Sequence, residues 1–104
     1  MDTAEAITAE KVIAVLRAHE AWLRAAGIRT LWLFGSVARG EARPDSDIDL
    51  VAEFDPAAKM DLIRLVGLEQ ELGDLLGREV QILPEPVEKP RLRASVERDR
   101  VRAF

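Results

Sequence analysis

Cysteine is absent from this 104-residue chain, and no apolar run approaches the roughly 18 residues that a membrane-spanning helix needs. The absence of cysteine excludes disulfide scaffolds and thiolate metal sites, and it is typical of proteins in the reducing cytoplasm. The lack of a long apolar run predicts a chain that does not cross a membrane. The opening residues Met1 to Glu5 also lack the basic flank and apolar stretch of a secretory signal. We therefore expect a cytoplasmic protein.

Histidine and positive charge are also scarce. The single histidine, His19, stands inside an expected helix, where it is more often a surface residue than a metal ligand or catalytic base. The chain holds 15 Lys and Arg against 19 Asp and Glu, a formal net charge of −4. This balance argues against a general nucleic-acid binder, because Lys and Arg dominate affinity for phosphate backbones. Residues 84–104 are locally basic, which fits either a solvated helix face or a surface for an acidic partner.

Apolar residues make up 48% of the chain, enough for one domain over residues 1–104 with a buried core. The apolar spacing predicts three helices and three strands, with helices over about 8–26, 60–76 and 90–102 and strands over about 30–34, 46–54 and 79–83. This order indicates an α/β fold in which helices flank a small three-stranded sheet. The helix between the second and third strands favours a parallel pair, whereas the direction of the first strand stays open.

The two longer expected helices differ in how clearly their apolar residues face one way. Thr8 can cap the first helix and Gly27 follows its end, while Trp22 lies off its apolar stripe. Trp22 therefore either packs beneath the tail helix or faces a partner. The second helix carries a broad apolar stripe, mainly core but wide enough for a second copy or a partner to contact. That stripe consists of Leu62, Leu65, Val66, Leu68, Leu72, Leu75 and Leu76.

Alternation along residues 46–54 separates the two faces of the second strand. Asp47, Asp49 and Val51 share one face, and apolar side chains occupy the other. If the second and third strands are parallel, their first residues lie side by side at one end of the sheet. Glu79 and Gln81 are then expected beside the two aspartates.

The residue types around this strand point to phosphoryl chemistry. Asp47 and Asp49 project from one face, and two carboxylates so close repel each other unless a cation lies between them. A hard divalent ion with a preference for oxygen, Mg²⁺ or Mn²⁺, suits such a pair. Gly35 permits close approach of backbone to a phosphate, and Ser36 adds a hydroxyl and an N–H. Arg39, about one turn further on, adds a charged donor. Together these residues predict the handling of a nucleoside triphosphate.

Each of these features is common by itself, but their order is specific. An apolar strand ends in Gly35-Ser36, ten residues follow, and Asp47-x-Asp49 opens the next strand. This arrangement, in the segment LFGSVARGEARPDSDIDLVAEFD, resembles the signature of the polymerase-β-like nucleotidyltransferases. Among these, the chain is similar to the smallest branch, the minimal nucleotidyltransferase (MNT) proteins. The likeness extends over nearly the whole chain, from the first helix to the tail.

The resemblance implies a mixed sheet flanked by helices and a magnesium-dependent nucleotidyltransferase. Gly35 and Ser36 would hold the triphosphate of ATP, and Asp47 and Asp49 would be the catalytic, metal-binding carboxylates. Many MNT proteins are antitoxins paired with a HEPN-domain RNase toxin, and they transfer AMP from ATP onto a tyrosine hydroxyl of that toxin. The resemblance therefore also implies a HEPN partner, in a homo- or hetero-oligomer.

One position departs from the family pattern. A third carboxylate usually stands on the third strand, where this chain has Gln81. An amide cannot take a proton from an attacking hydroxyl, and loss of a general base costs about 10²–10⁴ in rate. Glu79, one pleat away on the same strand face, is a candidate substitute. The alternative is an antitoxin with weakened or no catalysis that neutralises its toxin by covering it. A nucleotidyltransferase for small molecules or RNA ends fits less well, because the chain has no room for a substrate domain.

Overall fold

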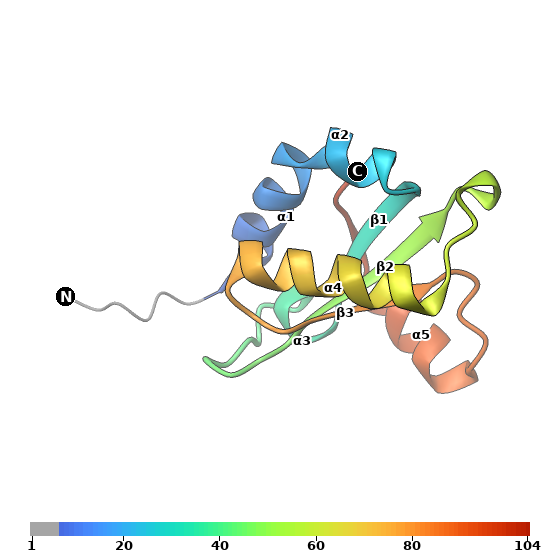
Figure 1. Ribbon diagram of the computed structural model, residues 1–104. Coiled ribbons are helices and arrows are strands. Elements are labelled where there is room, and N and C mark those ends of the chain that lie inside the picture. The colour runs from blue at the N-terminus through green and yellow to red at the C-terminus, as the bar shows by residue number, and fades with distance from the viewer. Residues whose placement is uncertain (1–6) are drawn as a thin grey trace.

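A computed structural model describes residues 7–104, so the expectation about a leader in Met1 to Glu5 lies outside the described residues. Figure 1 shows helices packed around one small sheet. No helix in the described part of the chain combines the length and the apolar character needed to cross a membrane. The elements are, in chain order, α1 (Ala9–Ala18), α2 (Glu20–Ala25), β1 (Ile28–Phe34), α3 (Gly35–Ala38), β2 (Ile48–Phe54), η1 (Pro56–Ala58), α4 (Leu62–Leu76), β3 (Val80–Pro84), α5 (Pro90–Asp99) and β4 (Val101–Arg102).

The sheet is mixed, with the strand order β3-β2-β1-β4. β2 and β3 run parallel, as the helical crossover predicted, and β1 is antiparallel to both β2 and β4. The predicted α/β fold with a mixed sheet is confirmed, but the prediction of three strands was wrong by one. The additional strand, β4, pairs with Trp32 and Leu33 of β1. Its residues were expected to form the end of the tail helix. A strand of two residues is too short to show any alternation, so its pairing was invisible in the sequence.

Two apolar clusters lie on opposite faces of the sheet. The larger cluster joins α1, α2 and α4 to one face and contains Val12, Leu16, Leu72, Leu31 and Leu50 among its buried members. The smaller cluster joins α5 and the segment before it to the other face, and its buried members are Phe34, Val51, Val87 and Val96. The sheet is therefore the middle layer of the fold.

The first predicted helix is in fact two helices that meet at His19. Thr8 caps α1 as expected, accepting a hydrogen bond from the N–H of Lys11 at 3.2 Å. His19 has non-helical backbone angles (φ −109°, ψ 19°), and one of its ring nitrogens lies 2.9 Å from the carbonyl oxygen of Val15. Leu16 before this break and Leu23 after it are both fully buried. The break lets both side chains reach the core. Trp22 remains 36% exposed, in a hollow between α2 and α4 beside His19 and Leu75, rather than beneath α5.

The apolar stripe of α4 is only partly buried. Leu68 and Leu72 are in the core, but Leu62 is 74% exposed, Leu75 45% and Val66 41%, so the stripe is less buried than the predicted, mainly core face. The first turn of α4 lies beside η1, where Arg64 donates from Nη1 to the carbonyl oxygen of Ala58 at 3.1 Å. Leu65 in this turn packs against the core, whereas Leu62 faces away from it.

Candidate active site

The end of β1 meets the start of β2 at Gly35. Because the two strands are antiparallel, Phe34 pairs with Asp49, and the chain turns immediately afterwards into α3. Gly35 has φ +80°, and a Cβ atom built there would lie 2.5 Å from Oδ2 of Asp49. Any side chain at position 35 would therefore displace the Asp49 carboxylate or the turn. The predicted glycine turn and one predicted metal-binding carboxylate are in direct contact.

The polar face of β2 lies where the alternation placed it. Val51 belongs to the cluster on the α5 side of the sheet, whereas Ile48 and Leu50 belong to the opposite cluster. Asp49 therefore projects on the α5 side. The parallel register sets Asp49 opposite Gln81 on β3. On β1, Asp49 pairs with Phe34, the residue before Gly35. The glycine turn, Asp49 and Gln81 therefore lie side by side across β1, β2 and β3.

Electrostatics at Asp49 show a site with excess negative charge. Burial raises the pKa of Asp49, the neighbouring charge of Asp47 raises it further, and the Arg39 guanidinium opposes this shift. Within residues 7–104 neither aspartate side chain receives a hydrogen bond. Two repelling carboxylates that lack protein donors are suited to a hard divalent cation, which needs only one or two carboxylates and takes its remaining ligands from water and phosphate.

Arg39 lies next to this pair but is held by other residues. It follows α3, and its Nη1 donates to Oδ2 of Asp99 at 2.7 Å while its Nε donates to Oε1 of Glu41 at 3.0 Å. Ser36 lies in α3, its carbonyl oxygen accepts from the N–H of Glu41 at 2.9 Å, and in the described chain its hydroxyl has no hydrogen-bond partner. The structure therefore brings together all five predicted site residues. Asp99, 60 residues away in sequence, was not predicted, because no motif marks it.

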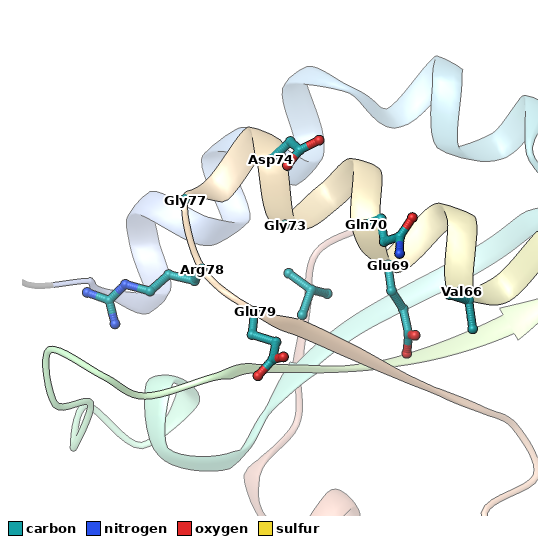
Figure 2. A pocket seen from close by; sticks show the side chains of 9 residues that line it. Val66, Glu69, Gln70, Gly73, Asp74, Gly77, Arg78 and Glu79 are labelled. Atoms are coloured by element: carbon teal, nitrogen blue, oxygen red, sulfur yellow. The ribbon is translucent and has the colours of Figure 1, made fainter.

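No third carboxylate completes the site. Among residues 7–104 no group of three His, Cys, Asp or Glu side chains is placed to hold a metal. Glu79 precedes β3 and its carbonyl oxygen accepts from the N–H of Ile48 at 2.9 Å. Its side chain points away from α4, as Figure 2 shows. It is therefore on the expected side of the sheet without forming a three-carboxylate cluster with Asp47 and Asp49.

Figure 2 also shows a groove of about 910 Å³ between α4 and the outer edge of β3. Glu69 reaches from α4 to this edge and accepts a hydrogen bond from the N–H of Ile82 at 2.8 Å. Neither Asp47 nor Asp49 lines the groove. The Glu69 side chain satisfies a backbone donor on the edge strand β3, so its role in the groove is accounted for by the sheet.

We expect Gly35→Ala to lower the melting temperature well beyond the effect of Gly40→Ala. Both glycines have positive φ, +80° and +75°, so alanine is strained at either position by about 1–2 kcal/mol. Only at position 35 would the added Cβ also meet a carboxylate oxygen, since nothing lies within 4 Å at position 40. Thermal unfolding measures the difference. Equal losses in the two variants would show that the contact between Gly35 and Asp49 is unimportant.

Asp49→Asn should stabilise the protein when no divalent cation is added. The raised pKa means that the folded state favours the neutral carboxyl, so the charged form costs stability above that pKa and the cost disappears as the pH falls through it. A neutral amide removes the cost, so the Tm of the metal-free variant should rise. The wild type should gain Tm on addition of Mg²⁺ and ATP, and the variant should not. A lower Tm for the metal-free variant would contradict this reading.

Comparison with known proteins agrees with the fold and identifies the family. Residues 15–103 match the model of the nucleotidyltransferase domain family. The chain is 37% identical over 78 residues to the protein adenylyltransferase MntA of Thermococcus cleftensis, an alignment that covers 74% of this chain and 77% of that protein. A solved structure provisionally named a minimal nucleotidyltransferase is 37% identical and superposes with a TM-score of 0.73, covering 90% of this chain and 94% of that one.

A more distant neighbour shares the fold. It is part of a Shewanella oneidensis complex of a tri-AMPylated HEPN toxin with an MNT antitoxin. The match has a TM-score of 0.64 and 20% identity, over 88% of this chain and 71% of that one.

The chain belongs to the nucleotidyltransferase domain family, because the family model covers most of its length. The resemblance of its Gly-Ser and Asp-x-Asp segment to the minimal nucleotidyltransferases is confirmed, and so is the prediction that the chain is a nucleotidyltransferase enzyme. The roles of Gly35, Ser36, Arg39, Asp47 and Asp49 stay predictions, argued from their geometry.

Proposed function

We propose that the chain transfers AMP from ATP to a tyrosine hydroxyl of a HEPN-domain toxin and so acts as its antitoxin. The observation that carries the proposal is the Asp47–Asp49 pair, which has no protein donor in the described chain and whose Asp49 carboxylate touches the Gly35 turn. One relative is named a protein adenylyltransferase, which supports AMP as the transferred group. A protein of the same fold was found with an AMPylated HEPN toxin, which supports a HEPN toxin as the acceptor.

Asp47 and Asp49 would hold the divalent cation, Mg²⁺ or Mn²⁺. Their carboxylates supply the hard oxygen ligands that such ions prefer, and the half-buried position of Asp49 strengthens its attraction for positive charge. When bound, the cation would neutralise charge on the triphosphate and orient it. A bound cation would also remove the repulsion that raises the pKa of Asp49.

The Gly35 turn, Ser36 and Arg39 would hold the triphosphate. Gly35 leaves the turn open to a phosphate, Ser36 offers its free hydroxyl, and Arg39 offers the N–H groups that Glu41 and Asp99 do not use. All three lie on α3 or at its end. One short segment therefore provides the nucleotide contacts directly beside the carboxylates.

The transfer exchanges one phosphorus–oxygen bond for another. The acceptor hydroxyl oxygen forms a bond to the α-phosphorus of ATP, the bond between that phosphorus and the bridging oxygen to the β-phosphate breaks, and pyrophosphate leaves. The hydroxyl proton passes to solvent, because Gln81 lies opposite Asp49 where a carboxylate would otherwise accept it. We therefore propose an enzyme that is slow for its class.

Gln81 also favours a second function, an antitoxin that neutralises its toxin by forming a complex with it. The neutral amide lacks the basicity that catalysis needs, whereas binding of a partner needs no base. The two functions differ in one requirement. Neutralisation by catalysis needs the Asp47 and Asp49 carboxylates, whereas neutralisation by binding survives their conversion to asparagine.

The test uses a HEPN protein encoded beside the gene for this chain. The two proteins are incubated with ATP and Mg²⁺, and the HEPN protein is weighed by mass spectrometry and assayed for RNase activity. We expect a mass gain of one or more AMP groups, loss of RNase activity, and neither effect with Asp47→Asn or Asp49→Asn. Inhibition that persists in both variants without a mass gain would replace the catalytic function with the binding one.

A further inference from the structure

Asp99, the last residue of α5, is held between two arginines. Its Oδ2 accepts from Nη1 of Arg39 at 2.7 Å, and its Oδ1 accepts from Nε of Arg98 at 2.9 Å. Only 4% of its side chain is exposed, although most charged residues of α5 are exposed. Both arginines hold the pKa of Asp99 at about 2, so its carboxylate stays charged at neutral pH.

The position of Asp99 is set by the core of the fold. Val96, one turn earlier on α5, is buried in the cluster with Phe34 and Val51. Just after Asp99, the Arg100 guanidinium stacks over the Trp32 ring, 4.9 Å from its centre, and β4 then pairs with β1. The Asp99 carboxylate is therefore attached on both sides to segments packed on β1, the strand that leads into Gly35.

Arg39 has donors left over after both of its ion pairs. A guanidinium has five N–H donors, and Arg39 uses Nε for Glu41 and one N–H of Nη1 for Asp99. In the described chain Nη2 donates to no residue. The charge of Arg39 still reaches Asp49 and lowers its pKa against the effects of burial and Asp47. Arg39 is thus fixed through Nε and Nη1, and its other N–H groups have no partner within the described chain.

We propose that Asp99 is a positioning residue that holds the Arg39 guanidinium beside Asp49, with its free N–H groups available to the triphosphate. This inference rests on the proposed function, because it needs a nucleotide at the Gly35 turn. Of the two partners of Arg39, Asp99 is the one that can fix the position of its guanidinium. Glu41 is 66% exposed and belongs to the loop after α3, whereas Asp99 is buried and carried by a packed helix. Charge-assisted hydrogen bonds of this kind fix both distance and orientation.

The opposite role for Asp99 would be to occupy Arg39 and compete with the nucleotide. Two features argue against competition. Asp99 and Glu41 together leave three of the five N–H donors of Arg39 free, and Arg98 supplies a second positive charge to the Asp99 carboxylate at 2.9 and 3.2 Å. The two roles give opposite signs when the charge of Asp99 is removed, because loss of a competitor would tighten nucleotide binding.

The test measures binding of ATP with Mg²⁺ by titration calorimetry, without an acceptor protein. We expect Arg39→Ala to weaken binding about 10- to 100-fold, as loss of a charged hydrogen bond does. Asp99→Asn keeps the size and one acceptor oxygen but loses the charge, and we expect it to weaken binding about 3- to 10-fold. The double variant should bind no more weakly than Arg39→Ala alone, because Asp99 acts through Arg39.

The matched control is Glu97→Gln, which breaks the exposed ion pair with Arg93 on the same helix and should leave binding unchanged. Unchanged or tighter binding by Asp99→Asn would overturn the positioning role, as would additive losses in the double variant. Circular dichroism and Tm establish that each variant is folded. If the wild type does not bind ATP with Mg²⁺, the proposed function fails and this inference fails with it. If only the Asp99 results fail, the proposed function stands.

Discussion

Asp47→Asn and Asp49→Asn should each reduce the rate of AMP transfer by about 10³-fold or more. Asp49 lies against the Gly35 turn with the charge of Asp47 beside it, and neither carboxylate has a protein donor within the described chain. A divalent cation contributes several kcal/mol to stabilising charge in a phosphoryl-transfer transition state, and each 1.4 kcal/mol or so is about tenfold in rate. An amide oxygen in place of a carboxylate removes a negative charge from the site.

The measurement is the initial rate of AMP incorporation into the HEPN acceptor at saturating ATP and Mg²⁺. Asp45→Asn is the matched control, because Asp45 is an exposed acid in the same loop, two residues before Asp47. It should keep the wild-type rate. If Asp47→Asn and Asp49→Asn behave like Asp45→Asn, the two carboxylates are not the metal site.

Gln81→Asp should raise the rate of AMP transfer, by about 10² to 10⁴ if proton removal limits the reaction. Gln81 is exposed on β3 and paired in register with Asp49, so an aspartate there fits without disturbing the core. Its carboxylate would share the face of the sheet that carries Asp49. The gain should appear in kcat, because the proposed contacts of ATP are the turn and Arg39 rather than position 81.

The added charge has a second measurable consequence. A third carboxylate increases the repulsion that already raises the pKa of Asp49, so the metal-free Gln81→Asp variant should melt below the wild type and recover on addition of Mg²⁺. Gln70→Asp adds the same charge on exposed α4 and should change neither rate nor metal dependence. An unchanged rate in Gln81→Asp would mean that proton removal does not limit transfer.

Much of the site was predictable because its residues obey short-range rules. The two-residue period predicts the face on which Asp49 projects from β2, and Asp47, just before the strand, is close enough to raise the pKa of Asp49. The helical crossover makes β2 and β3 parallel, which sets Gln81 beside Asp49. The Gly-Ser turn follows directly from the end of an apolar strand. What the pattern left open was the direction of β1. Its antiparallel pairing with β2 is the feature that brings Gly35 into contact with Asp49.

The remaining differences come from long-range contacts. The exposure of Leu62 depends on what lies next to the start of α4, and the apolar pattern of the helix does not show what it packs against. The strand β4 exists because β1 has a free edge. Asp99 becomes part of the site only when α5 packs against β1 and brings it to Arg39. A sequence pattern describes one element at a time, so residues that meet through packing escape it.

The most direct test of the central claim is amide NMR of the protein with Mn²⁺ and ATP, because the paramagnetic ion broadens signals close to it. The account predicts selective broadening around Asp47 and Asp49 and at Gly35 and Ser36, lost in Asp49→Asn and reversed by excess Mg²⁺. Broadening that is absent, or that centres on another part of the chain, would contradict the assignment of these two aspartates as the metal site.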